Sequence, residues 1–149
     1  MKNSKDNKLV VIYTDGSCDP NPGPGGWAAL IITGEDQRIL KGSEKQSTNN
    51  RMELKAALEG IKSVDEFLTI ALYTDSQYLQ RGVQEWMDNW KARGWRRKGG
   101  KLANVDLWKE ISKEIDRREI SWHWVRGHAG NPYNERVDQI AQQMAVKTK

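Results

Sequence analysis

The run of residues from Leu9 to Tyr13 constrains the fold more than any other feature of this chain. Five apolar or aromatic residues follow one another without a break, and Thr14, Asp15 and Gly16 then end the run. An uninterrupted run of this length, rich in β-branched residues, is typical of a strand that is covered on both faces of a sheet. We therefore predict a central strand that carries Asp15 at its carboxyl end, where open α/β sheets bind their ligands.

A second predicted strand ends in the same three residue types. Tyr73, Thr74 and Asp75 close a β-prone segment that begins at Thr69. If the two strands are neighbours in a sheet, their carboxylates lie side by side at one edge. We expect the rest of the chain to supply the partners of Asp15 and Asp75.

Two further acids lie on predicted helices. Glu53 borders an apolar face of helical spacing that begins at Leu54, and Asp138 borders the apolar stripe of the last predicted helix. If the first helix packs on the sheet, Glu53 points along the surface of the sheet toward the strand ends. Taken alone, each acid also fits a simpler interpretation, a turn-forming Asp or a solvated helix face.

The other elements are predicted from periodicity and from helix-capping residues. The segment 18–26 is rich in Pro and Gly and is expected to be a loop. Because strands come first and then alternate with helices, we predict an α/β protein with a mixed sheet flanked by helices. Besides the first strand, the predicted strands are 27–33, 38–43, 69–74 and 120–125. Four helices are predicted: one after Thr48, one over 79–90, one that starts at the N-cap Asn104 and one that starts at the N-cap Asn131.

The length and the apolar content of the chain set outer bounds. With 149 residues, we expect one domain over 1–149, with residues 1–8 as a frayed N-terminus. No apolar stretch reaches the roughly 20 residues of a membrane helix, and no apolar signal region follows the start, so we expect a cytoplasmic protein without membrane contact. The single cysteine, Cys18, cannot form an internal disulfide, which fits a reducing compartment.

The net charge of +4 is concentrated in the segment 91–101, here called the basic window. This segment has no acid, and the rest of the chain carries 18 basic and 20 acidic residues. Such localised positive charge predicts a patch that binds a polyanion, and a solvated charge run is the alternative. The cations of the basic window are Lys91, Arg93, Arg96, Arg97, Lys98 and Lys101.

Tryptophans cluster in and around the basic window. Trp86 and Trp90 follow a helical spacing with Leu79 and are expected in the core. Trp95 lies outside that stripe, so we expect it to be exposed and to be the better candidate for contact with nucleic acid.

Five motifs resemble those of the bacterial type 1 ribonuclease H family, in the same order and with the expected elements between them. They cover about residues 9–145. The resemblance implies the ribonuclease H-like fold, with a five-stranded mixed sheet flanked by helices, in a monomeric endonuclease. It also implies hydrolysis of the RNA strand of RNA–DNA hybrids, leaving 3′-hydroxyl and 5′-phosphate ends. The motifs are Thr14–Ser17, Thr48–Leu54, Thr74–Tyr78, Gly127-His128 and Asn134–Asp138.

The resemblance implies two divalent metal ions, usually Mg²⁺ with Mn²⁺ as a substitute. Oxygen ligands suit these hard cations, and two ions roughly 3.5–4 Å apart stabilise both the attacking and the leaving oxygen of an in-line displacement. Asp15 is the candidate that bridges both ions, because it lies on the most buried strand. The family's metal ligands correspond to Asp15, Glu53, Asp75 and Asp138.

Two histidines are interpreted differently. His128 lies in a loop between Gly127 and Gly130, and the resemblance implies that it assists catalysis by proton transfer or by helping product and metal leave. A purely structural loop is the alternative. His123 matches no motif and is expected to be a surface histidine.

The resemblance also implies a set of substrate contacts. Thr48 and Asn104 correspond to residues that hold a DNA-strand phosphate, and the basic window with Trp95 corresponds to a protrusion that grips the DNA strand. The family often has Arg where this chain has Gln46 and Lys where it has Ala103, so Lys45 and Lys101 are possible substitutes. The residues implied for the groove that reads the RNA 2′-hydroxyls are Asn21, Asn49, Asn50 and Gln77.

Two other classes remain open at this stage. A DNA-cleaving relative of the same fold shares carboxylates at strand ends, and a hybrid-binding module without catalysis shares the fold. All four acids are present, which argues against the module. The Thr-Asn-Asn motif, the basic window and the Gly-His loop together argue against the DNA-cleaving relative.

Overall fold

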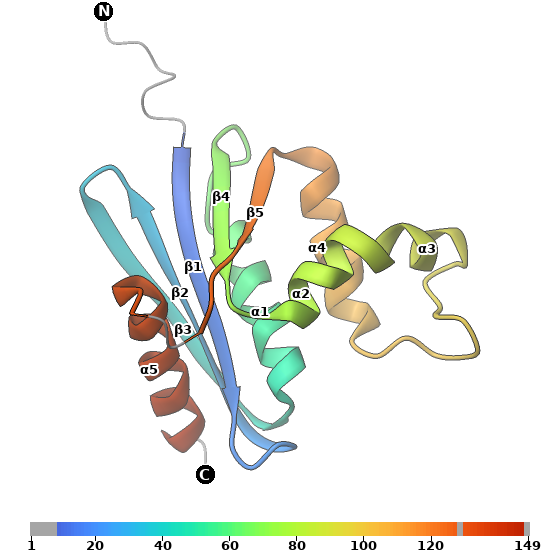
Figure 1. The fold of residues 1–149 in the computed structure, drawn as a ribbon, viewed down its shortest axis with the longest axis horizontal. Coiled ribbons are helices and arrows are strands. Elements are labelled where there is room, and N and C mark those ends of the chain that lie inside the picture. Colours follow the sequence, from blue (N-terminus) through green and yellow to red (C-terminus); the bar gives the residue numbers. More distant parts are fainter. Residues whose placement is uncertain (1–8, 128–129, 148–149) are drawn as a thin grey trace, which may run out of the picture.

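The computed structural model describes residues 9–127 and 130–147, and its strands form one five-stranded sheet with the order β3-β2-β1-β4-β5 (Figure 1). Strands β1, β2 and β3 form an antiparallel meander, and β4 and β5 continue the sheet in parallel with β1. The predicted mixed sheet flanked by helices is therefore confirmed. The elements are β1 (Leu9–Cys18), β2 (Gly23–Thr33), β3 (Asp36–Ser47), α1 (Asn49–Lys62), β4 (Thr69–Thr74), α2 (Gln77–Arg81), a π-helical turn (Gly82–Trp86), α3 (Met87–Ala92), α4 (Val105–Arg117), β5 (Ile120–Trp124) and α5 (Pro132–Lys147).

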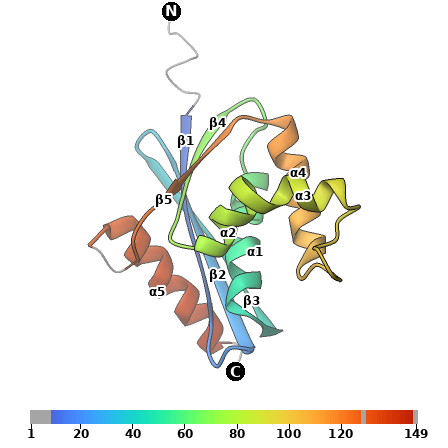
Figure 2. The ribbon, with the colours of Figure 1, turned by 45° about the vertical axis from the view of Figure 1, so that its right-hand side comes forward.

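Helices cover the two faces of the sheet unequally. Helix α5 lies on one face, and α1 lies on the other with α4 beyond it (Figures 1 and 2). Side chains along β1 alternate between the two layers, so that Ile12 packs in the core beneath α1 and Tyr13 packs with Val137 of α5. Asp15 lies two residues after Tyr13, so its side chain leaves the strand on the face of the sheet that α5 covers.

Helices α1 and α5 begin where the sequence predicts. The Thr48 hydroxyl accepts a hydrogen bond from the Arg51 backbone N–H at 3.1 Å, which caps α1. The Asn131 carboxamide accepts from the backbone N–H groups of Tyr133 and Asn134, both at 3.0 Å, and Pro132 is the first residue of α5. Within the described residues, no helix combines the length and the apolar content needed to cross a membrane.

The predicted loop 18–26 is largely wrong, because β1 continues to Cys18 and β2 already begins at Gly23. Gly25 and Gly26 pair with Cys18 and Ser17 in the ladder. A Cβ on Gly26 would lie 2.3 Å from the Ala141 backbone oxygen of α5. These glycines allow helices to pack closely on a strand, so their structural role depends on neighbours that are distant in the sequence.

The longer β2 also pairs with a longer β3, which spans Asp36–Ser47 where the prediction was 38–43.

The single helix predicted over 79–90 is divided by a π-helical turn. Gly82, the first residue of that turn, packs so closely on Trp108 that a Cβ there would lie 2.1 Å from the indole ring. Trp90, beyond the π turn, is buried, whereas Trp86, the last residue of the turn, is only partly buried. The core assignment is right for Trp90 and partly right for Trp86.

Candidate active site

Asp15 and Asp75 come together through the register of two parallel strands. Thr14 pairs with Thr74, and this is the last pair between β1 and β4, so the two acids follow immediately after it. The prediction that the carboxylates lie side by side is confirmed. Asp15 is not at the end of its strand, however, because β1 continues for three residues along β2.

Glu53 reaches the two aspartates because α1 crosses β1 at a glycine. A Cβ on Gly16 would lie 2.4 Å from the Glu53 nitrogen and 2.4 Å from the Met52 carbonyl carbon. These are backbone atoms that cannot move aside, so only glycine allows this approach. The N-terminal half of α1 is thereby held against the strand that carries Asp15.

The three acids form one compact cluster. Each of Asp15, Glu53 and Asp75 offers a carboxylate oxygen, and these oxygens all lie within 4.8 Å of one another. Oε1 of Glu53 is buried and accepts no hydrogen bond from any described residue. Such an unpartnered buried oxygen is costly, because it has lost its hydration without compensation.

Burial and mutual repulsion shift the titration of the cluster. Burial, followed by the nearby Asp75, raises the pKa of Asp15 to about 8. Burial and the two aspartates raise the pKa of Glu53 well above its ordinary value, and burial and Asp138 raise that of Asp75. The cluster is therefore short of positive charge.

Helix α5 contributes two more groups from one face. Asp138 lies near enough to Asp15 and Asp75 to raise the pKa of both, although it lies outside the compact cluster of three, and its oxygens accept from Gln142 Nε2 at 3.2 Å. Asn134 is buried, and its side-chain amide favours the charged form of the Asp75 carboxyl group, which lowers the pKa of Asp75. The sequence argument did not single out Asn134. Its spacing of four residues from Asp138 was the available signal, since such residues share a helix face.

These observations show that the residues fit a hard divalent cation. The donor set consists of carboxylate oxygens, which Mg²⁺ and similar cations prefer. A cation would neutralise the repulsion that raises the pKa of all three clustered acids, and it would give the Glu53 oxygen a partner. All four predicted acids are therefore placed where they could contribute to such a site.

Of the two histidines, only His123 lies within the residues that the structure describes. His128 lies outside the described residues, and the last described residue before it, Gly127, lies against Asp75, with a Cβ there 2.9 Å from Asp75 Oδ2. The expectation of a surface position for His123 is only partly right. Its ring is half-buried and stacks on Tyr73 at a centroid distance of 4.6 Å.

Three of the four predicted groove residues lie around the start of α1. The Asn21 carboxamide oxygen accepts from the Asn49 backbone N–H at 3.2 Å. The Asn21 NH₂ group therefore remains available to donate to a ligand. Asn49 and Asn50 form the exposed first turn of α1. Gln77 is exposed at the start of α2, two residues after Asp75.

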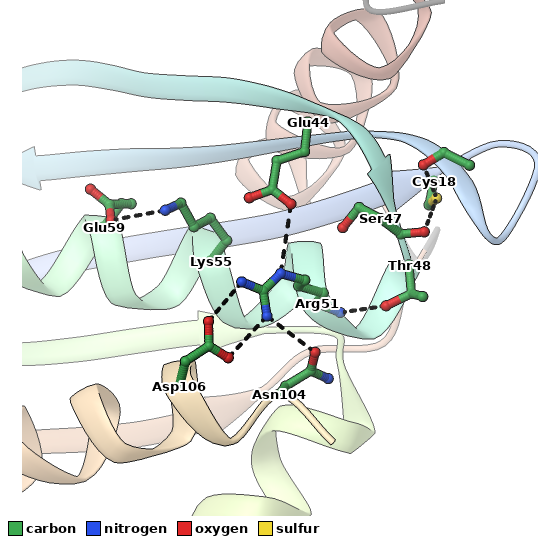
Figure 3. A network of polar contacts seen from close by, with 10 residues as sticks. Cys18, Glu44, Ser47, Thr48, Arg51, Lys55, Glu59, Asn104 and Asp106 are labelled. Atoms are coloured by element: carbon green, nitrogen blue, oxygen red, sulfur yellow. Dashed lines mark hydrogen bonds and ion pairs between the residues drawn. The ribbon is translucent and has the colours of Figure 1, made fainter. Parts of the chain in front are cut away.

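Asn104 does not cap α4 with its side chain, contrary to the prediction. It occupies the N-cap position with a left-handed backbone (φ 59°), whereas a side-chain cap needs an extended one. Its carboxamide instead accepts from Arg51 Nη1 at 3.4 Å and donates to the Tyr78 hydroxyl at 3.2 Å. Figure 3 shows Arg51 between Asn104 and Thr48.

The basic window divides into engaged and free cations. Lys91 forms an ion pair with Asp116 at 3.7 Å, and Arg97 Nε donates to the Lys101 carbonyl oxygen at 2.9 Å. Among the described residues, no side-chain partner is found for the four exposed cations Arg93, Arg96, Lys98 and Lys101.

The expected exposure of Trp95 is only partly right. Its ring is half-buried and packs against the main core, and its backbone N–H donates to the Trp90 carbonyl oxygen at 2.7 Å. The ring still lines a surface cavity of about 470 Å³ together with Arg96 and Lys101. The exposed part of Trp95 is therefore available to a ligand at this cavity.

Comparison with known proteins yields consistent similarities. The RNase H family model matches residues 7–146, a range that contains all four acids. The chain is 51% identical over 135 residues to a ribonuclease H of Hahella chejuensis, covering 90% of this chain and 91% of the relative. It is 45% identical over 144 residues to a ribonuclease H of Bordetella pertussis, covering 96% and 93%. A solved type 1 RNase H with the type 2 active-site motif superposes with a TM-score of 0.84 at 32% identity, covering 96% of this chain and 74% of that one.

Proposed function

This chain belongs to the ribonuclease H family, and from that premise we propose that it hydrolyses the RNA strand of RNA–DNA hybrids as an endonuclease. The observation that carries the proposal is the cluster of Asp15, Glu53 and Asp75, with their oxygens within 4.8 Å of one another and one of them buried without a partner. A cluster of this kind is stable as charged carboxylates only when cations neutralise it.

The acids would hold two divalent cations, Mg²⁺ or Mn²⁺ in its place, with Asp15 between them and Asp138 on the α5 side. When bound, the cations supply charge stabilisation for the attacking water and for the leaving 3′ oxygen, so that 3′-hydroxyl and 5′-phosphate ends result. Asn134 favours the charged form of the Asp75 carboxylate. Gly16 keeps Glu53 within reach of Asp15.

His128 is proposed to assist this reaction by proton transfer or by helping product and metal leave. Its sequence neighbour Gly127 lies against Asp75, which supports a role close to the acids. General acid–base assistance contributes about 10²–10⁴-fold in rate. His128 is therefore proposed as a group that accelerates turnover and not as one that holds metal.

Substrate recognition is proposed to divide between the two strands. Neutral amides near the start of α1 and α2 suit the RNA strand, because amides donate to and accept from 2′-hydroxyls. Thr48 and Asn104 are proposed to bind a DNA phosphate, and the free cations of the basic window to bind further DNA phosphates. The amides proposed for the RNA strand are Asn21, Asn49, Asn50 and Gln77.

We also propose that the protein acts as a cytoplasmic monomer. Cys18 is a free, buried thiol, and a reducing compartment suits it. Sedimentation of the purified chain tests the monomer, and fractionation of cells tests the location.

The test compares cleavage of four end-labelled substrates of the same sequence. They are an RNA–DNA hybrid, an RNA duplex, a single RNA strand and a DNA duplex. We expect Mg²⁺-dependent cleavage of the hybrid alone, with 3′-hydroxyl and 5′-phosphate products. Cleavage of duplex DNA instead would identify a DNA-cleaving enzyme of this fold. Tight hybrid binding without cleavage would identify a binding module, and Asp15→Asn serves as the inactive control.

A further inference from the structure

Arg51 is bonded to both residues proposed to hold the DNA phosphate. Its backbone N–H donates to the Thr48 hydroxyl at 3.1 Å, and its Nη1 donates to the Asn104 carboxamide oxygen at 3.4 Å (Figure 3). These contacts connect the start of α1 with the start of α4. Arg51 itself has no role in the function proposed above.

The Arg51 guanidinium is itself occupied by protein carboxylates. Nη1 and Nη2 bind the two oxygens of Asp106 at 3.1 and 2.8 Å, and Nε lies 3.6 Å from Glu44. A fork that is already paired in this bidentate way has little capacity left for a phosphate. Because two carboxylates surround one cation, the local charge is also unfavourable for a phosphate bound directly by Arg51.

The Asn104 carboxamide is fixed at both of its ends. Its oxygen accepts from Arg51, and its Nδ2 donates to the Tyr78 hydroxyl at 3.2 Å. That hydroxyl also accepts from Nε1 of Trp108, which is fully buried, so the amide is connected to the core. The second hydrogen on Nδ2 has no acceptor among the described residues.

Thr48 is oriented in the same way from the other side. Because its oxygen accepts from the Arg51 N–H, its hydroxyl hydrogen remains available to donate. Thr48 and Asn104 thus each keep one free donor, and Arg51 holds both. Both donors are neutral, and the positions at which the family often has cations are Gln46 and Ala103 in this chain.

We propose that Arg51 and Tyr78 are positioning residues that preorganise the Thr48 hydroxyl and the Asn104 amide as a neutral donor pair for one phosphate of the DNA strand. This inference rests on the proposed function. Preorganised donors bind tightly because their ordering is completed before the ligand arrives. Arg51 acts through its neighbours and does not touch the phosphate.

The test combines protein variants with single neutral methylphosphonate linkages placed in turn along the DNA strand of the hybrid. In the unmodified protein, we expect one linkage position to raise KM about tenfold with kcat unchanged, the loss expected from one charge-assisted hydrogen bond. Arg51→Lys keeps the charge beside Asp106 but cannot span Asp106 and Asn104 together. We expect it to raise KM for the unmodified hybrid about tenfold and to reduce the effect of that linkage to less than threefold.

Arg38→Lys is the matched control, because Arg38 Nη2 donates to the Ser63 carbonyl oxygen at 2.9 Å at the opposite end of α1. It should retain the full effect of the neutral linkage whatever its melting temperature. Tyr78→Phe should resemble Arg51→Lys, since it frees the other end of the amide. If Arg51→Lys retains the tenfold effect, Arg51 is merely structural and the inference is wrong. If the unmodified protein cleaves no hybrid, the proposed function fails first.

Discussion

Asp15 is a buried carboxyl group whose charged form is unfavourable in the folded chain. It is 3% exposed, and it faces two other carboxyl groups at close range. In the folded chain it keeps its proton up to about pH 8, whereas in the unfolded chain it releases the proton near pH 3.8. The folded state therefore binds more protons between these values, and the free energy of unfolding falls as the pH rises through this window.

Asp15→Asn should abolish cleavage and stabilise the protein in metal-free buffer. At pH 8 with EDTA we expect a free energy of unfolding higher by about 2–4 kcal/mol, because the amide removes the buried charge and keeps the shape. Below pH 4 the two proteins should be equally stable. Urea unfolding at several pH values measures the difference, and a gap that does not depend on pH would contradict this assignment.

His128→Ala should slow turnover of the hybrid without abolishing it. A proton can also come from solvent, so we expect a loss at or below about 10²–10⁴-fold. Single-turnover kinetics at saturating Mg²⁺ measure the chemical step, and steady-state kinetics include product release. His123→Ala is the control, since this is the other histidine of the chain and it stacks on Tyr73. A His128→Ala protein as inactive as Asp15→Asn would make His128 essential.

At the scale of elements, the contact between α1 and β1 determines whether the acids meet. The contact depends on Gly16, where a side chain would overlap the backbone of Met52 and Glu53. The apolar face of helix α1 is fully buried against the sheet, and this packing holds the helix in place. A small displacement of this helix would separate Glu53 from Asp15.

Gly16→Ala should destabilise the protein by about 2–3 kcal/mol and reduce cleavage strongly, because the added methyl group forces α1 away from β1. Thermal unfolding and cleavage assays measure the two effects. Gly100→Ala is the control, because a Cβ there contacts nothing within 4 Å and Gly100 lies in the basic window. Normal activity of Gly16→Ala would mean that Glu53 is not needed beside Asp15.

The basic window is a second element whose effect is separable from the chemistry. Arg93, Arg96 and Lys98 are exposed and have no partner among the described side chains. Arg97 and Lys91 are engaged with the protein itself. These three and Lys101 are the free cations of the basic window, and they are therefore the best candidates for contacts with phosphates.

Replacing Arg93, Arg96 and Lys98 together with Gln should raise KM and leave kcat nearly unchanged. Each lost phosphate contact should flatten the log–log salt dependence of KM by about 0.7–0.9. Steady-state kinetics at several salt concentrations give this slope. Lys62→Gln, at the far end of α1 beside Glu110, is the control that should not alter it. A lower kcat with an unaltered KM would place the active site near the window.

At the scale of the whole molecule, the acidic site joins parts that are distant in the sequence. Its acids come from β1, from α1, from the end of β4 and from α5. Helices α1 and α5 lie on opposite faces of the sheet (Figure 1). A cation bound by these acids would therefore stabilise the arrangement of both layers.

Mg²⁺ should raise the melting temperature of the unmodified protein. At a free concentration ten times Kd, binding adds about 1.4 kcal/mol, which corresponds to roughly 3–6 °C for a chain of this length. Calorimetry at pH 8 in Mg²⁺, against NaCl of equal ionic strength, measures the shift. Asp15→Asn should show a much smaller one. An equal shift for both proteins would indicate a cation bound elsewhere.

The sequence by itself determined most of the strands and helices, because the unbroken apolar run of β1 and the apolar stripe of α1 are properties of consecutive residues. The four acids were identified together by the motifs of the family resemblance, which occur in order along the chain. The repeated Tyr-Thr-Asp ending also predicted the pairing of Asp15 with Asp75, since parallel strands in register align equal endings.

Only the tertiary structure decided which small residues and amides serve the site. The glycines at 25 and 26 signalled a loop, yet they lie in a strand because Met52 and α5 pack against them. Asn104 signalled a helix cap, yet Arg51 and Tyr78 bind its side chain. These roles depend on contacts between segments that are far apart in the sequence, such as Gly26 and Ala141, and no local pattern encodes such contacts.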